Sequence, residues 1–283
     1  MADGTRKLLA YLELSRPVNV AITFCSIPAA SILAGARSPD WVQVVLAAAT
    51  GGLVAAGANA INDFFDLEID TINRPNRPLP RGALSRGDAR AFWLITSLIA
   101  IGLNFFLNIK ALGIVVFAVS VLYYYSAALK RTVFAGNLVV GVLTGMAFIY
   151  GAVAVGRFER SLMPAAFAFL VNVGRELIKD VEDLEGDRRE SAATLPVKYG
   201  VKPAQILTTV ILSALVATTI LAYILQLYNL WYLYLVLVID VALVFVIGSM
   251  WKDSSPVNLG RLSSILKFTM VIGLIAIFVG SLP

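Results

Sequence analysis

Histidine is absent from this chain of 283 residues, and cysteine occurs once, at Cys25. The lack of histidine excludes imidazole as a general base, a nucleophile or a metal ligand. A single cysteine excludes a disulfide within the chain. Any chemistry that the protein performs must therefore use carboxylates, amides, hydroxyls, lysine and arginine.

Charge is also scarce. Only 14% of the residues are charged and 59% are hydrophobic, with a mean hydropathy of +0.81. Soluble domains have about 25% charged and about 45 to 50% apolar residues, so the composition excludes an ordinary soluble protein. The residues before Pro17 are charged and amphipathic, and the apolar stretch after them is long enough to span a bilayer. We therefore expect no cleavable signal peptide.

Apolar runs of about 20 residues are long enough to cross a bilayer as helices. The sequence predicts nine such spans, with approximate limits 17–36, 41–62, 90–109, 111–128, 136–156, 162–180, 203–226, 230–250 and 264–282. We expect an all-α protein, a polytopic membrane bundle of nine transmembrane helices with cytosolic cap loops. Residues 1–283 should form a single integral membrane domain.

The distribution of positive charge predicts the orientation. With the N-terminus in the cytosol, the 23 Lys and Arg residues minus the four at Arg37, Lys110, Arg157 and Arg160 leave 19 on the cytosolic side. The positive-inside rule favours this arrangement. We therefore expect a multi-pass protein of the cell membrane whose N-terminus and active-site loops are cytosolic. Before the first span, apolar residues at helical spacing beside cations predict an interfacial helix.

Aspartate recurs with the spacing D-x-x-D-x-x-x-D at two places, each at the end of an apolar span. The first motif contains Asp63, Asp66 and Asp70, and the second motif contains Asp180, Asp183 and Asp187. Positions i, i+3 and i+7 share one helix face, so each motif predicts a stripe of carboxylates. The two spans run in the same direction, which suggests an internal duplication with two acidic walls facing a cavity.

Carboxylates about 6 Å apart repel by roughly 2 to 3 kcal/mol per pair at an effective dielectric near 20. Helix C-terminal ends also favour cations. A solvated helix end with incidental acids is the alternative, but ten of the 18 acids, four plus six, fall within residues 63–70 and 176–187. Oxygen ligands without histidine favour Mg²⁺, which commonly shares its coordination sphere with phosphate oxygens. The motifs therefore predict Mg²⁺ and a bound diphosphate.

Cationic and aromatic residues accompany the motifs. The loop after the first motif carries Arg74, Arg77 and Arg81 among three prolines, and guanidinium groups suit phosphate oxygens. Decoration by the positive-inside rule is the alternative for any one of them. Tyrosines precede Lys130 at the cytosolic end of the fourth span, where an aromatic belt is the simplest explanation when they are taken alone.

These features together resemble the UbiA-type intramembrane prenyltransferases over nearly the whole chain. The residues that carry the resemblance are N-D-x-x-D-x-x-x-D at 62–70, the R-P pattern at 74–78 and D-x-x-x-D at 183–187. The resemblance implies Mg²⁺ between the two motifs, an isoprenyl diphosphate whose tail lies among the helices, and ionisation to an allylic cation. One departure concerns the family's tyrosine-to-lysine motif, since four residues separate Tyr125 from Lys130 where three are usual.

The candidate site residues fall into two groups. Metal ligands are expected at Asp63, Asp66, Asp70, Asp180, Asp183 and Asp187, of which Asp63, Asp66, Asp183 and Asp187 are also the candidate catalytic residues. Substrate contacts are expected at Asn59, Asn62, Arg74, Arg77, Tyr124, Tyr125, Lys130 and Lys179. The asparagines would support the metal, the cations would bind the diphosphate, and a tyrosine ring could shield the carbocation.

The motifs most resemble archaeal members of the family that prenylate a glycerol phosphate ether. They imply transfer of a geranylgeranyl group from its diphosphate to a lipid-phosphate acceptor, geranylgeranylglyceryl phosphate, among membrane lipids and with no nucleic-acid partner. The many cations near the acids also suit a phosphorylated acceptor.

Two alternatives remain at this point, and a third class is excluded. An aromatic prenyltransferase acting on 4-hydroxybenzoate or a quinone precursor shares parts of the motifs. An ion-coupled transporter is more distant and would use Asp240, in the middle of the eighth predicted span. A CDP-alcohol phosphotransferase requires a D-G and A-R signature that this chain lacks.

Overall fold

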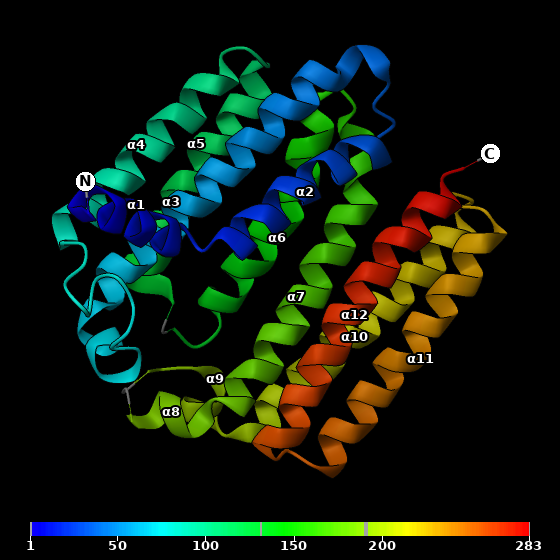
Figure 1. Cartoon of the computed structure of the whole chain (residues 1–283). Coiled ribbons are helices and arrows are strands. Elements are labelled where there is room, and N and C mark those ends of the chain that lie inside the picture. The colour runs from blue at the N-terminus through cyan, green and yellow to red at the C-terminus, as the bar shows by residue number, and fades with distance from the viewer. Residues whose placement is uncertain (1, 131, 190–191, 283) are drawn as a thin grey trace. The chain divides into compact units, whose positions relative to one another are not determined.

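The computed structural model describes residues 2–130, 132–189 and 192–282, and these ranges contain helices and no strand (Figure 1). The all-α prediction is therefore confirmed. The α-helices are α1 (Ala2–Ser15), α2 (Pro17–Leu33), α3 (Trp41–Asn73), α4 (Arg86–Asn104), α5 (Ile109–Tyr124), α6 (Ala135–Ala154), α7 (Leu162–Glu182), α8 (Leu184–Arg189), α9 (Leu195–Tyr199), α10 (Val201–Ile224), α11 (Leu230–Lys252) and α12 (Pro256–Gly280). Shorter helical turns are η1 (Ser38–Asp40), η2 (Tyr125–Leu129) and η3 (Phe158–Ser161).

Polar residues fix several helix starts. At the start of α4, the backbone N–H of Asp88 donates to Ser85 Oγ at 3.0 Å, and the N–H of Ser85 donates back to Asp88 Oδ2 at 2.9 Å. This capping box satisfies backbone donors that the first turn leaves without partners. The hydrogen bonds from Ser85 hold the pKa of Asp88 well below its usual range, because they stabilise the charged carboxylate.

Within the described ranges, seven helical segments are long and apolar enough to cross a membrane, or eight if the pair of α1 and α2, bent by 54°, counts as one span. The multi-pass prediction is confirmed, whereas the count of nine is not. Two predicted spans account for the difference. Helix α2 has only 17 residues, and α4 carries Arg86, Asp88 and Arg90 in its first turns.

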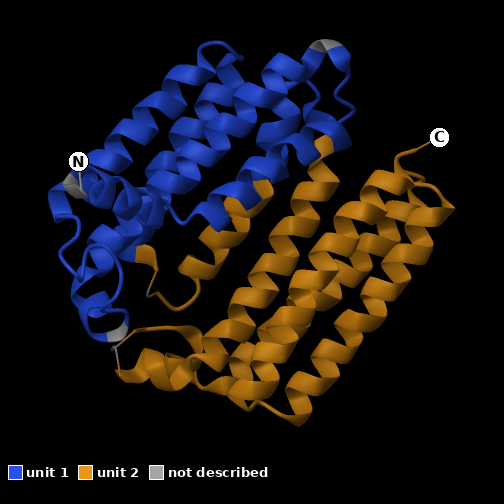
Figure 2. Cartoon of the chain, in the orientation of Figure 1, with its two compact units in different colours: residues 1–128, 147–159 blue, residues 129–146, 160–283 orange. Residues whose placement is uncertain are grey.

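Two compact units make up the chain (Figure 2). Unit 1 comprises residues 1–128 and 147–159, and unit 2 comprises residues 129–146 and 160–283, so that α6 contributes to both. The first aspartate motif lies on α3 in unit 1. The second lies at the end of α7 in unit 2, so each unit contains one motif. A single domain over residues 1–283 stays a prediction.

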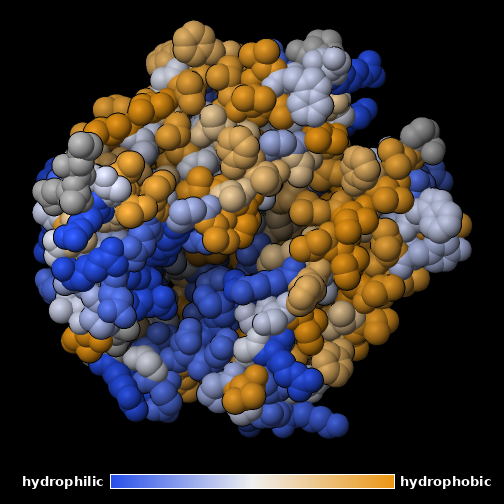
Figure 3. All heavy atoms as spheres, in the orientation of Figure 1, coloured by the Kyte–Doolittle hydropathy of each residue, from blue (hydrophilic) through white to orange (hydrophobic). Residues whose placement is uncertain are grey.

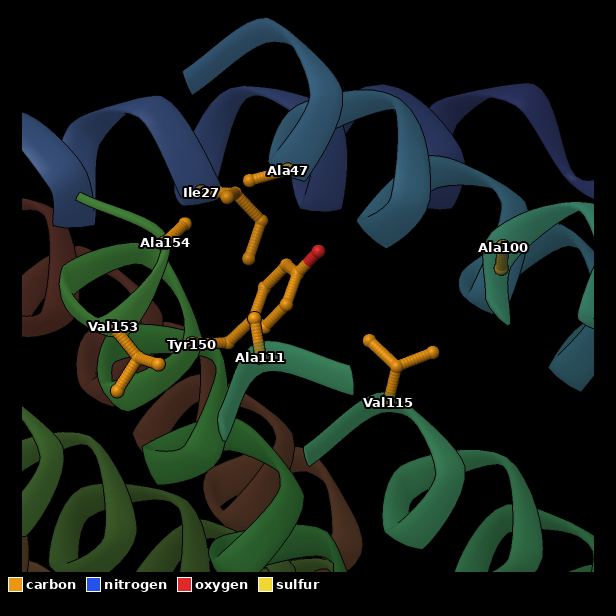
Figure 4. Packing of buried hydrophobic residues seen from close by; sticks show 8 residues of the cluster. All are labelled: Ile27, Ala47, Ala100, Ala111, Val115, Tyr150, Val153 and Ala154. Carbon is orange, nitrogen blue, oxygen red and sulfur yellow. The ribbon is translucent and has the colours of Figure 1, made fainter. Parts of the chain in front are cut away.

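Small side chains allow the helices of unit 1 to pack closely. Its buried cluster combines Ile27 and Tyr150 with four alanines and two valines, as Figure 4 shows. Tyr150 donates from its hydroxyl to Asn104 Oδ1 at 3.0 Å, and Asn104 Nδ2 donates to Thr50 Oγ1 at 3.3 Å. These polar contacts connect α6, α4 and α3. Small residues and interhelical hydrogen bonds are the main sources of helix association in lipid, where apolar burial gives no driving force.

Helix α1 packs on the same unit through one of its faces. Ala10 and Leu14 are buried in a second cluster with Ala60, Leu79, Leu84 and Ala89. Leu8, Leu9 and Leu12 on α1 remain 62%, 60% and 51% exposed. One face of α1 therefore lies against α3 and the loop that follows it, while apolar side chains on the other face are exposed, as an interfacial helix requires.

Unit 2 is built from long helices, with α7 packed against α10 and α12, and α11 packed against α10 and α12. Its visible surface over α11 and α12 is mainly apolar (Figure 3). Thr219 on α10 donates to Asp240 Oδ1 on α11 at 3.0 Å, and the hydroxyl of Tyr232 donates to the Thr219 carbonyl at 3.1 Å. Asp240 is thus a buried polar contact between two helices.

Gly151 provides a test of close packing in unit 1. A Cβ at this position would lie 2.7 Å from the Cβ of Ala30 and 2.8 Å from the carbonyl oxygen of Ile27 on α2. We expect Gly151→Ala to lower the stability by about 1 to 3 kcal/mol, the usual range for overpacking. The apparent Tm in detergent measures this. Gly113→Ala is the control, because nothing lies within 4 Å of its Cβ position; an equal loss of Tm in both variants would contradict the packing argument.

Candidate functional site

The first motif lies on a single uninterrupted helix. Helix α3 extends to Asn73, well beyond the predicted span limit at residue 62. Asp63, Asp66 and Asp70 are only 2%, 7% and 5% exposed. The expectation that they share one helix face is confirmed, since all three are buried at spacings of three and four residues. The aspartate spacing alone did not indicate that this face would be buried.

Two guanidinium groups form ion pairs with two of the three carboxylates in this stripe. Arg16 forms an ion pair with Asp63 Oδ1, and Arg77 forms an ion pair with Asp70 Oδ2. Arg77 Nη1 also lies 3.4 Å from Asp63 Oδ1, so that it bridges two turns of α3. Asn62 Nδ2 donates to Asp66 Oδ2 at 2.9 Å. Because buried like charges repel strongly, the motif depends on these positive partners.

The loop that follows α3 positions Arg77. Its backbone folds on itself, with the N–H of Arg81 donating to the Arg77 carbonyl at 3.1 Å and the N–H of Ala83 donating to the Pro78 carbonyl at 2.9 Å. Leu79 and Leu84 are buried, at 5% and 3% exposure, in the cluster beneath α1. Burial of these leucines holds the loop in place. The two arginines predicted to contact phosphate therefore differ in position. Arg77 lies over the motif, whereas Arg74 is exposed.

Arg16 was not among the predicted site residues. It lies at the boundary between α1 and α2. Its backbone adopts a left-handed conformation, with φ of 52° and ψ of 75°. Asn59 Nδ2 on α3 donates to the Ser15 carbonyl at 2.8 Å, immediately before this residue. Asn59 therefore holds the α1–α2 boundary in this structure. The R-P pair at residues 16 and 17 is the sequence signal that could have revealed this corner, since proline favours a helix start.

The second motif differs in conformation. Helix α7 ends at Glu182, and Asp183 lies between it and α8 with φ of −89° and ψ of 5°. The expectation of one uninterrupted helix for all three acids is therefore wrong. Gly186 within the short α8 lowers the local helix propensity. Backbone bonds from the N–H of Asp183 to the Lys179 carbonyl and from the N–H of Asp187 to the Asp183 carbonyl still keep four-residue spacing.

Neutral donors and solvent surround the second motif. Asn137 Nδ2 on α6 donates to Asp180 Oδ2 at 2.8 Å, and Thr194 Oγ1 donates to Asp187 Oδ2 at 2.9 Å. Asp183 is exposed. Neither Asn137 nor Thr194 was predicted as a site residue. Asn137 lies 43 residues from Asp180 in the sequence, whereas Thr194 lies only seven residues from Asp187. They orient two of the three carboxylates.

Two cations share one acid on the preceding turn of α7. Arg175 Nη1 lies 2.9 Å from Glu176 Oε1, and Lys179 Nζ lies 3.5 Å from Glu176 Oε2. The Nε of Arg175 is buried and has no hydrogen-bond partner in the part of the chain that the structure describes. This group therefore offers a donor to an incoming oxygen.

The tyrosine region contains a π-helical turn. Helix α5 ends at Tyr124, which is 61% exposed, and η2 is a π-helix from Tyr125 to Leu129. A π turn holds more residues than an α turn, so it accommodates the extra residue between Tyr125 and Lys130. Tyr123 was not predicted, yet its ring packs edge-on against Phe65 on α3, with centroids 5.5 Å apart.

The donor set fits Mg²⁺. Among the described residues, no group of three or more acidic or cysteine side chains is already drawn together as a metal site. The buried carboxylates of the first motif instead face cations, which shows that their surroundings accommodate positive charge. Oxygen donors alone suit Mg²⁺ rather than Zn²⁺.

Comparison with known proteins decides the family. The model of the UbiA prenyltransferase family matches residues 22–279. The chain belongs to this family. A digeranylgeranylglyceryl phosphate synthase from Methanopyrus kandleri is 38% identical to it over 273 residues, which cover 96% of this chain and 99% of that protein. The synthase from Methanocaldococcus jannaschii is 34% identical over 280 residues, which cover 98% and 97%.

Solved structures agree with this membership. A structure described as giving insights into digeranylgeranylglyceryl phosphate synthase in membranes matches with a TM-score of 0.88 and 34% identity, covering 97% of this chain and 98% of that one. A UbiA homolog from Archaeoglobus fulgidus bound to DMAPP and Mg²⁺ matches with a TM-score of 0.70 and 20% identity, covering 94% and 98%. The second likeness concerns the fold. The protein is a prenyltransferase, and the transporter and phosphotransferase alternatives are excluded.

Arg77 and Arg74 allow a matched test of this geometry. Removing the charge of Arg77 takes away the ion pair of the buried Asp70 and leaves Asp63 with Arg16, a loss that costs on the order of 3 kcal/mol. We therefore expect Arg77→Gln to lower the apparent Tm of the metal-free protein clearly. Arg74→Gln should leave it nearly unchanged, because that side chain is exposed. Equal shifts for the two variants would contradict the ion-pair geometry.

Proposed function

We propose that this protein transfers a geranylgeranyl group from its diphosphate to geranylgeranylglyceryl phosphate, with Mg²⁺ held by the two aspartate motifs. The observation that carries the proposal is the buried, arginine-matched first motif in a chain that aligns almost end to end with named digeranylgeranylglyceryl phosphate synthases. Family membership supports the reaction class, and full-length similarity supports the acceptor.

Cleavage of the allylic diphosphate is the step that the site must promote. It leaves negative charge on the diphosphate and positive charge on the prenyl carbon. Bound Mg²⁺ supplies electrostatic stabilisation of the leaving diphosphate. Arg77 and Lys130 are proposed to bind its oxygens, with Arg74 reaching the same anion from the exposed part of the loop. The ring faces of Tyr124 or Tyr125 are proposed to shield the allylic cation.

The acceptor is a glycerol hydroxyl, which is a poor nucleophile. An allylic cation is a strong electrophile, so the reaction needs no histidine base, and the chain has none. The acceptor's phosphate brings about two negative charges at neutral pH. Arg175 and Lys179 on α7 are our candidates to bind it, because the buried Nε of Arg175 has no hydrogen-bond partner among the described residues. A phenolic acceptor would use few cations beyond those that hold the diphosphate.

The orientation and the number of spans belong to the same proposal. We propose that α2 and α4 also cross the cell membrane, which gives nine spans with the N-terminus and both motifs on the cytosolic side. The support is the excess of cations on that side. Hydrophilic side chains gather over α1 and the loop that follows α3 (Figure 3).

Neutralising single aspartates tests the metal assignment. Asp66→Asn and Asp183→Asn keep the side-chain size but remove a ligand charge, so we expect each to lower Mg²⁺-dependent transfer at least about a hundredfold. Prenyl transfer in reconstituted membranes measures this, and Glu159→Gln, at an exposed acid in η3, is the control. Full activity in both aspartate variants would refute the assignment.

Separate incubations with two acceptors of different chemical classes test the acceptor assignment. Purified protein is incubated with geranylgeranyl diphosphate, Mg²⁺ and either geranylgeranylglyceryl phosphate or 4-hydroxybenzoate. We expect product only from the glyceryl phosphate, and we expect Arg175→Gln to raise its KM because a phosphate contact is lost. Efficient transfer to the phenol alone would replace the proposed acceptor while leaving the prenyltransferase assignment intact.

Thiol labelling tests the orientation. In a Cys25→Ser background, Asn76→Cys should react with a membrane-impermeant reagent only after cell lysis, since the loop after α3 is proposed to be cytosolic. Arg160→Cys should react in intact cells, because it lies on the opposite side. The reverse labelling pattern would overturn the proposed topology.

A further inference from the structure

Arg16 has three properties that general membrane topology does not explain. It is one of only two residues other than glycine with positive φ among the described residues. Its side chain is 31% exposed, yet its guanidinium pairs with an Asp63 side chain that is 2% exposed. It also lies at a 54° bend between two helices. A residue in this conformation persists only where its surroundings hold it.

Helix α1 and its contacts hold Arg16 in this position. Tyr11 donates to Asp88 Oδ1 at 3.0 Å, and Lys7 Nζ lies 3.1 Å from the same oxygen. Glu13 accepts from Arg81 Nη2 at 2.7 Å. Leu14 is fully buried, at 0% exposure. Together with the bond from Asn59 to the Ser15 carbonyl, these contacts fix both the backbone before Arg16 and its approach to α3.

Asp63 requires a cation whether or not a metal is present. Its carboxylate is almost completely buried and lies on the same helix face as Asp66 and Asp70. Arg77 already bridges Asp63 and Asp70, so it cannot fully neutralise both. Arg16 supplies the second positive charge. A divalent ion that arrives at the first motif must therefore compete with the guanidinium of Arg16 for the same Oδ1 atom.

We propose that Arg16 is the counter-ion of Asp63 in the metal-free enzyme, and that it gives way to Mg²⁺ when the first motif is loaded. Arg16 is then a positioning residue delivered by α1, which keeps the buried carboxylate charged and correctly oriented before the metal binds. Once displaced, its guanidinium can pair with the incoming diphosphate, so the positive charge is conserved at the site. This proposal rests on the proposed function in assigning Mg²⁺ to the first motif.

A double-mutant cycle tests the counter-ion role without any metal. Arg16→Gln leaves Asp63 without its second cation and should lower the apparent Tm of the metal-free protein in detergent. Asp63→Asn removes the charge that needs compensation, so adding Arg16→Gln to it should cause little further loss. Arg86→Gln is the control, because Arg86 pairs at 3.8 Å with an 89% exposed Glu68. Additive losses in the double variant would overturn the proposal.

A Mg²⁺ titration tests the competition. The Mg²⁺ concentration that gives half of the rise in Tm should fall at least threefold in Arg16→Gln and stay near the wild-type value in Arg16→Lys, which keeps a competing cation. An unchanged or higher concentration in Arg16→Gln would overturn the proposed role of Arg16 but not the proposed function. If Mg²⁺ does not raise the Tm of the wild-type protein, the metal assignment of the proposed function fails as well, whatever the result of the double-mutant cycle.

Discussion

The ion pairs between Arg16, Arg77 and the aspartates of α3 are the interaction on which the candidate site depends. A helix that buries three carboxylates on one face is unstable unless cations approach them closely. The chain supplies these cations from two directions, from the α1–α2 bend and from the loop after α3. Both segments are anchored by buried leucines and by hydrogen bonds to α3 or α4. The packing around α1 thus places the positive charges of Arg16 and Arg77 against the aspartates of α3.

The two motifs have the same aspartate spacing but different surroundings. The first is buried and matched by guanidinium groups, whereas the second has neutral donors at Asp180 and Asp187 and an exposed Asp183. Prenyl transfer as proposed uses this difference. The first motif would hold metal ions in a preformed environment, and the second would add ligands that remain accessible until substrate binds.

Sequence patterns predicted the helical class, the limits of most spans and the shared face of the first motif, because these follow from hydropathy and periodicity. They did not predict that Arg16 pairs with Asp63, since 47 residues separate them and only the tertiary fold brings them together. The break at Asp183 and the π turn at Tyr125 were also missed. Both are local changes in backbone conformation, and hydrophobic periodicity does not reveal such changes. The count of nine spans was not confirmed, and α4, which carries charge in its first turns, is one of the two predicted spans that account for the difference.

Both motifs are proposed to bind the same metal-bound diphosphate. In a Cys25→Ser background, spin labels attached at Thr71→Cys and Glu185→Cys, each beside one motif and exposed, report on this directly when Mn²⁺ replaces Mg²⁺. With a non-hydrolysable geranylgeranyl thiodiphosphate present, bound Mn²⁺ should strongly attenuate the electron paramagnetic resonance signal of both labels in separate single-label samples. Attenuation at only one label, or at neither, would contradict the claim.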